Sequence, residues 1–104
     1  MKRYRVVGIN NYNYNYTLED ESANTHKISL QFYDTVSPQI GEYITFSENL
    51  LDKKANEGVV HFSFGKFSEI YGKNITPENM NENQNEILII ERNNQKLYLK
   101  RFYG

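Results

Sequence analysis

The chain contains no cysteine and no tryptophan, only two prolines and no long hydrophobic run. Without cysteine there are no disulfides, thiolate nucleophiles or sulfur ligands, so a metal would need histidine or carboxylate ligands. The two histidines, His26 and His61, do not belong to a ligand-spaced motif such as His-x-x-x-His. We therefore expect no cofactor and no metal site.

The chain also lacks an excess of either charge: 12 basic and 13 acidic residues give a formal net charge of −1. No global field therefore attracts it to nucleic acid or to an anionic membrane. No apolar run reaches the length of a membrane span or of a signal-peptide core. We expect a cytoplasmic protein that does not bind membranes. Because 104 residues is an ordinary domain size, we interpret residues 1–104 as one β-rich domain.

Catalytic signatures are missing as well. Ser63 lacks the glycine two residues before it that a nucleophile elbow needs, and Gly65 and Gly72 lack the lysine and hydroxyl residue of a phosphate-binding loop. The acidic run from Glu19 to Ser22 lacks the alternating ligands and the glycine of a calcium loop. A site of two paired carboxylates stays open, but no pair stands out. We predict that the protein is not an enzyme.

What the sequence does contain is a strict alternation of asparagine and tyrosine from Asn10 to Tyr16. In a β-strand this pattern places the tyrosines on one face and the asparagines on the other. We interpret Arg3 to Leu18 as one long strand bent at Gly8; the alternative is two shorter strands joined by a tight turn at Asn10-Asn11. The asparagine content has a second explanation, an A+T-rich genome, because A- and T-rich codons specify Asn, Lys, Ile and Tyr.

Alternation of apolar and polar residues predicts further strands. They cover Lys27–Tyr33, Glu42–Phe46, Gly58–Phe64, Glu86–Arg92 and Lys96–Tyr103. Asn93 and Asn94 tolerate the left-handed conformations of a tight hairpin turn, so the last two strands are predicted to form a hairpin. Ser47 is a suitable N-cap for one short helix near residues 48–55. Residues 73–85 are nearly all polar and predict a loop.

Short connections favour antiparallel pairing, and curling the sheet buries its aromatic rings and removes its edges. The predicted fold class is mainly β: a small antiparallel barrel or roll with one short helix. The layout resembles the OB fold, a five-stranded barrel with a long kinked first strand and a helix between its third and fourth strands. Gly8, the helix after Phe46 and the strand opening at Gly58 carry this resemblance, whereas an extra strand in the last hairpin departs from it.

Tyrosines with nearby cations form the candidate binding surface. Its members are Tyr12, Tyr14, Tyr16, Tyr33, Arg3, Arg5, Lys27, Lys100 and Arg101. Tyrosine gives a large contact area at low entropy cost and asparagine offers donors and acceptors, so we rank a non-enzymatic protein-binding module first. Its partner would be another protein or a copy of itself, and a strand from Asn10 to Thr17 at a sheet edge could add to the partner's sheet.

The alternative function is binding of single-stranded nucleic acid, with bases stacked on the tyrosines and phosphates on the cations. We rank it lower because phosphate contacts supply most nucleic-acid affinity and the net charge is slightly negative. Against both functions stands a purely structural role, in which the tyrosines fill the core and the cations are ordinary surface charges.

Overall fold

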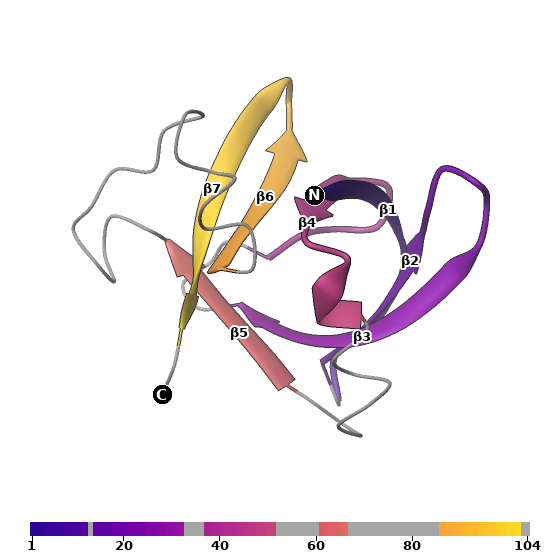
Figure 1. Ribbon diagram of the computed structural model, residues 1–104, viewed down its shortest axis with the longest axis horizontal. Coiled ribbons are helices and arrows are strands. Elements are labelled where there is room, and N and C mark those ends of the chain that lie inside the picture. Colours follow the sequence, from indigo (N-terminus) through magenta and orange to yellow (C-terminus); the bar gives the residue numbers. More distant parts are fainter. Residues whose placement is uncertain (13, 33–36, 52–60, 67–85, 103–104) are drawn as a thin grey trace.

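The computed structural model describes residues 1–12, 14–32, 37–51, 61–66 and 86–102 (Figure 1). Within these ranges lie seven β-strands. They are β1 (Lys2–Asn10), β2 (Asn15–Glu19), β3 (Thr25–Phe32), β4 (Tyr43–Phe46), β5 (His61–Lys66), β6 (Ile87–Arg92) and β7 (Gln95–Phe102).

The strands form one sheet in the order β1-β2-β3-β5-β7-β6-β4, and β4 pairs with β1, so the sheet closes into a ring. All pairs are antiparallel except β3 and β5, which run parallel. The ring is not a regular barrel, and its seven strands exceed the five of the OB fold. The predicted fold class, mainly β with one short helix, is confirmed. No helix in the described ranges is long and apolar enough to cross a membrane.

The N-terminal segment is two strands rather than one. β1 ends at Asn10 and β2 begins at Asn15, and the two strands pair antiparallel. The single strand from Arg3 to Leu18 is therefore wrong, and the alternative of two shorter strands is confirmed. The predicted tight turn at Asn10-Asn11 is displaced, because Asn10 pairs with Asn15 and residues 11–14 lie between the strands. An unbroken strand of that length would overrun a small ring, whereas two strands pair with each other. The register between β1 and β2 also shifts just before Gly8, which places an irregularity where the sequence predicted a bend.

The tyrosine stripe is divided by this turn. Tyr16 on β2 lies in the core and is 6% exposed, while Tyr12 and Tyr14 lie in the turn and are 100% and 46% exposed. The turn has fixed backbone contacts: Asn10 Oδ1 accepts a hydrogen bond from Tyr12 N at 3.1 Å, and Tyr14 O accepts one from Leu30 N at 2.9 Å. Tyr14 has a left-handed φ of 58°, which breaks the alternation. The predicted strand face with all three tyrosines is wrong, because turn residues do not follow the period of a strand.

The interior of the ring is filled by apolar side chains that alternate along the strands. They include Tyr4, Val6, Tyr16, Leu18, Ile28, Leu30, Ile44, Phe46, Phe62, Phe64, Leu88, Ile90 and Leu99. The ring centroids of Tyr4 and Phe46 are 4.9 Å apart, a contact between β1 and β4 that helps to close the sheet. Burial of each large apolar side chain contributes about 1.5–3 kcal/mol.

The predicted C-terminal hairpin is confirmed. Asn93 and Asn94 join β6 to β7 with φ values of 52° and 62°, as a two-residue turn with left-handed residues requires. β7 begins at Gln95, one residue earlier than predicted.

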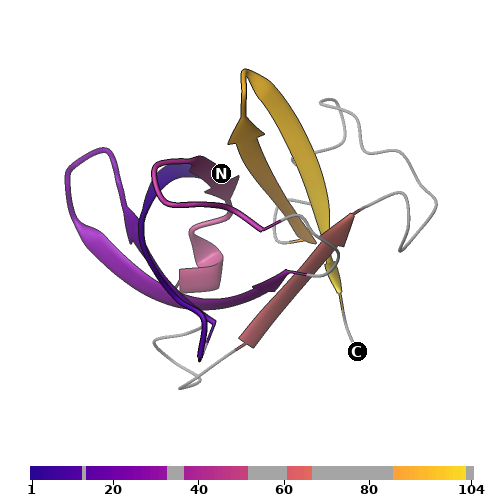
Figure 2. The same cartoon turned by 180° about the vertical axis from the view of Figure 1, so that it is seen from behind.

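The start of the predicted helix is also confirmed. Ser47 Oγ accepts a hydrogen bond from Asn49 N at 3.3 Å, and Ser47 O accepts one from Leu50 N at 3.1 Å. The helical residues lie within the outline of the ring in both views (Figures 1 and 2), and Leu50 is part of the buried core. The rest of the predicted helix, residues 58–60 of the next predicted strand and the predicted loop 73–85 lie outside the described residues.

Candidate functional site

A row of charged and aromatic side chains crosses five strands on the outer face of the sheet. Arg5 on β1 lies opposite Glu19 on β2 and, on its other side, opposite Tyr43 on β4. Tyr43 lies opposite Glu91 on β6, and Glu91 lies opposite Lys96 on β7. We call these five residues the outer row. It spans roughly 19 Å, because neighbouring strands are about 4.8 Å apart.

The pattern of the core places this row on the outside. Tyr4 and Val6 are buried on either side of Arg5, so Arg5 points away from the core. Ile44 is buried in the same way next to Tyr43. The alternation that fills the ring therefore also determines which polar side chains meet on its outer face.

Arg3 is held over the ring of Tyr43 at the centre of the outer row. Its guanidinium carbon lies 3.7 Å from the centroid of the Tyr43 ring. Arg3 Nε and Nη2 donate hydrogen bonds to the two carboxylate oxygens of Glu91, each at 3.0 Å. These bonds raise the pKa of Arg3 above its ordinary value. A bidentate pair fixes the orientation of the guanidinium, so arginine and tyrosine form a pre-organised platform.

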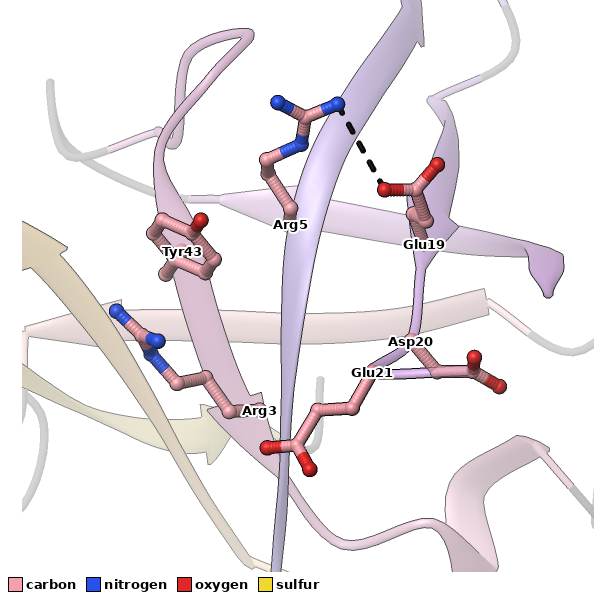
Figure 3. A pocket seen from close by; sticks show the side chains of 6 residues that line it. All are labelled: Arg3, Arg5, Glu19, Asp20, Glu21 and Tyr43. Atoms are coloured by element: carbon pink, nitrogen blue, oxygen red, sulfur yellow. Dashed lines mark ion pairs between the residues drawn. The ribbon is translucent and has the colours of Figure 1, made fainter. Parts of the chain in front are cut away.

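A pocket of about 420 Å³ lies on one side of this platform (Figure 3). Its lining residues are Arg3, Arg5, Glu19, Asp20, Glu21 and Tyr43. Arg5 Nη2 is 3.6 Å from Glu19 Oε1, which is too long for a hydrogen bond, so Arg5 keeps N–H donors for a ligand. Glu21 makes no hydrogen bond or ion pair within the ranges that the structure describes. We call this the acidic pocket, because three of its lining residues are carboxylates.

The wall of the acidic pocket is fixed by the turn between β2 and β3. Asp20 Oδ1 accepts hydrogen bonds from the backbone N–H groups of Ser22 and Asn24, each at 2.9 Å. Asp20 Oδ2 lies 2.8 Å from His26 Nε2. The contact with His26, together with these backbone bonds, lowers the pKa of Asp20. These bonds therefore fix the backbone of the turn that carries Glu21.

A second pocket of about 570 Å³ is also lined by Arg3 and Tyr43, and extends to the β6–β7 hairpin. Its lining includes Asn94 and Lys96. The side chain of Lys96 is exposed and makes no hydrogen bond or ion pair in the described part of the chain. We call this the hairpin pocket.

The five cations of the predicted binding surface do not form one basic surface. Arg3 and Arg5 lie together on β1, but each faces a carboxylate, Glu91 or Glu19. Lys27 on β3 lines a separate pocket of about 400 Å³.

The two remaining predicted cations, on β7, are separated from this cluster. Lys100 and Arg101 are successive residues and face opposite sides of the sheet. The Arg101 guanidinium lies 4.7 Å from the ring centroid of Phe62, a core residue.

The predicted tyrosines do not line the outer row. Tyr16 is buried, and Tyr12 and Tyr14 lie at the far end of β1 from Arg3. Tyr33 lies outside the described residues. The tyrosine that contacts the arginines is Tyr43, which the sequence analysis missed. Its position on the outer face could be predicted, because it precedes the buried Ile44. Its neighbours could not, because they depend on the pairing of β4 with β1 and β6.

The outer row and its two pockets offer hydrogen-bond donors, acceptors and an aromatic surface. Arg5 and Lys96 supply donors, Glu19 and Glu21 supply acceptors, and Tyr43 supplies aromatic surface. In the part of the chain that the structure describes, no three histidine, aspartate or glutamate residues are grouped so that they can hold a metal ion.

Comparisons with known proteins do not identify a family. The sequence matches no family model, and no curated protein and no solved structure shows significant similarity to it. Evidence for a function therefore comes from the outer row and its two pockets.

Proposed function

We propose that this protein is a non-enzymatic module that binds a segment of another protein across the outer row. The observation that carries the proposal is the platform of Arg3 and Tyr43, which Glu91 fixes through two hydrogen bonds and which borders two pockets. Tyrosine and arginine dominate interface hot spots, and a platform ordered before binding lowers the entropy cost of association.

The dimensions fit a short extended segment. Along the curved sheet the outer row spans roughly 19 Å, and an extended chain rises about 3.3 Å per residue, so a segment that follows the whole row needs at least about six residues. Such a segment would contact the platform with its central residues and reach one pocket with each end. Addition of a partner strand at Asn10 to Thr17 is not part of the proposal, because β2 already pairs with β1 and β3 on its two sides.

Binding of single-stranded nucleic acid by an OB-like barrel is the second candidate, and Tyr12 is the observation that favours it. Its fully exposed ring is available for stacking on a base. The cations oppose this candidate, because Arg3 and Arg5 face carboxylates and a phosphate backbone there would meet Glu19 and Glu21. We therefore keep protein binding first.

Selection from a random-peptide library displayed on phage tests the proposal. We expect the wild-type protein to enrich a set of peptides, and a synthetic copy of an enriched peptide to bind Tyr43→Ala at least about tenfold more weakly, because truncating a hot-spot aromatic residue costs that much or more. Tyr12→Ala is the matched control and should bind as the wild type does, since Tyr12 lies outside both pockets. Circular dichroism checks that each variant is folded.

Two outcomes would contradict the proposal: no enriched peptide, or enriched peptides that bind Tyr43→Ala and the wild type equally well. A titration with labelled single-stranded oligonucleotides at low and high salt separates the second candidate. Saturable binding that weakens with salt would favour nucleic acid. Sedimentation of the protein alone, over a range of concentrations, shows whether its partner is a second copy.

A further inference from the structure

Most charged side chains around the outer row are matched in pairs. The pairs are Arg3 with Glu91, Arg5 with Glu19, and Arg92 with Glu42. Asp20 is in hydrogen-bond contact with His26. The pairs of Arg3 and Arg92 are hydrogen-bonded, whereas Arg5 and Glu19 are 3.6 Å apart and neutralise each other's charge without a hydrogen bond. Charged side chains without an ion pair are therefore the ones whose charge a partner can neutralise.

Among the described residues that line the two pockets, Glu21 and Lys96 carry charges of opposite sign, and their side chains make no hydrogen bond or ion pair. After the hydrogen bonds from Arg3 to Glu91, the charge of Glu21 also contributes to the raised pKa of Arg3. Glu21 is exposed in the acidic pocket, on the turn between β2 and β3. Lys96 is exposed in the hairpin pocket, and the carboxylate of Glu91 opposite it is already bonded to Arg3.

The two charges lie at opposite ends of the proposed binding surface. β1, β4 and β6 lie between the turn that carries Glu21 and strand β7, which carries Lys96 (Figure 1). With strands about 4.8 Å apart, the path between them along the outer row covers roughly 14–19 Å of curved sheet. The platform of Arg3 and Tyr43 lies on this path. On the other side of the closed ring, β3 and β5 complete the circuit.

We infer that the bound segment carries a basic side chain that pairs with Glu21 and an acidic side chain that pairs with Lys96, separated by at least about four residues of chain that follows the outer row. This inference rests on the proposed function and names the chemistry of the partner. A uniformly acidic segment would be repelled by Glu21 and a uniformly basic one by Lys96, so the surface discriminates among partners by charge pattern.

The test uses the same displayed library on the wild type and on two charge reversals. The wild type should enrich peptides with one basic and one acidic residue at least about four positions apart. Lys96→Glu leaves acidic groups at both ends and should enrich peptides with two basic residues. Glu21→Lys leaves basic groups at both ends and should enrich peptides with two acidic residues.

Affinity measurements with one synthetic wild-type-selected peptide give the second readout. Each charge reversal should weaken its binding about tenfold at low salt and less at high salt, because exposed ion pairs are screened. The neutral variants Glu21→Gln and Lys96→Gln should show smaller losses. Lys27→Glu makes the same charge change as Lys96→Glu outside both pockets and should leave binding unchanged. Circular dichroism confirms the fold of every variant.

The outcomes separate this inference from the proposed function. If peptides are enriched and depend on Tyr43 but show no charge pattern, and if both charge reversals bind them as the wild type does, the inference is wrong and the protein-binding proposal stands. If no peptide is enriched at all, both fall.

Discussion

Replacing Glu42 with alanine removes a carboxylate that ties the segment before β4 to strand β6. Glu42 accepts hydrogen bonds from Arg92 Nε at 2.7 Å and from Arg92 Nη2 at 2.8 Å, and its Oε1 also accepts one from Gln39 N at 2.7 Å. Arg92 Nη2 donates a further bond to Ser37 O at 2.7 Å. The variant therefore loses the three hydrogen bonds that the Glu42 carboxylate accepts, and the Arg92 guanidinium keeps only its bond to Ser37 O.

The magnitude follows from the number and burial of these bonds. A hydrogen bond to a charged group contributes about 1.5–3 kcal/mol when it is shielded from solvent. The side chains of Arg92 and Glu42 are 29% and 18% exposed, so water partly replaces the lost contacts. We expect Glu42→Ala to lower the free energy of unfolding by about 2–3 kcal/mol in total. For a chain of this length that corresponds to a fall in Tm of about 10–20 °C.

Urea unfolding followed by far-UV circular dichroism measures the loss, and Glu48→Ala is the matched control. Glu48 forms an ion pair of 3.0 Å with Lys2, but these side chains are 55% and 61% exposed. Exposed pairs contribute little, so the control should unfold at the wild-type urea concentration. Equal urea midpoints for Glu42→Ala and Glu48→Ala would refute the reasoning. The partly buried contacts of Glu42 would then contribute no more stability than an exposed ion pair.

The same carboxylate gives a pH dependence whose sign is fixed. The hydrogen bonds from Arg92 hold the pKa of Glu42 below its ordinary 4.5. The stabilisation is therefore present above the ordinary pKa and is lost as the pH falls through the lower pKa of the folded state. Glu42→Gln should lack this part of the acid dependence, and urea unfolding at a series of pH values measures it.

Three further predictions concern the β1–β2, β6–β7 and β2–β3 turns and the core. Tyr16→Ala should lower the free energy of unfolding by about 3–5 kcal/mol because its ring is buried, whereas Tyr12→Ala should leave it unchanged; equal urea midpoints would contradict this assignment. Asn94→Val should destabilise the hairpin by about 1–3 kcal/mol because φ is 62°, while Asn94→Gly should be tolerated; thermal melts compare the two, and a tolerated valine substitution would argue against the turn. The pKa of Asp20 is lowered mainly by its contact with His26. The ionised Asp20 carboxylate therefore stabilises the fold above its ordinary pKa of 3.8, and this stabilisation is lost as the pH falls through the lower pKa of the folded state. An acid titration followed by circular dichroism should show this dependence in the wild type and not in Asp20→Ala.

The sequence predicted the strands whose residues alternate between core and solvent. Ile28 and Leu30 on β3, and Ile44 and Phe46 on β4, are buried as their parity predicted. Local rules also identified the hairpin turn at Asn93, because a left-handed turn restricts residue type strongly.

The tyrosine stripe shows where the same reasoning failed. Tyr12, Tyr14 and Tyr16 share one parity, but alternation continues through a turn in the sequence without continuing in space. Asparagine favours turns, and this propensity together with closure of the ring prevailed over the strand pattern. The competing signal was present at Asn10-Asn11, and the sequence alone did not decide between the two.

The outer row was beyond sequence analysis for a different reason. Arg5, Tyr43 and Glu91 lie on three strands that are far apart in the chain, and they meet only because of the pairing order and register of the ring. Lys96 faces Glu91 across the local β6–β7 hairpin. Period-two patterns predict which face a residue occupies, but the strand beside it depends on the whole fold.

The most direct test of the binding proposal is the location at which a library-selected peptide perturbs the backbone amide signals of isotope-labelled protein. We predict that the largest chemical-shift changes during the titration lie at Arg3, Arg5, Tyr43 and Lys96, on the outer face of β1, β4 and β7. Changes confined to the β1–β2 turn around Tyr12, with the signals of the outer row unmoved, would contradict the account.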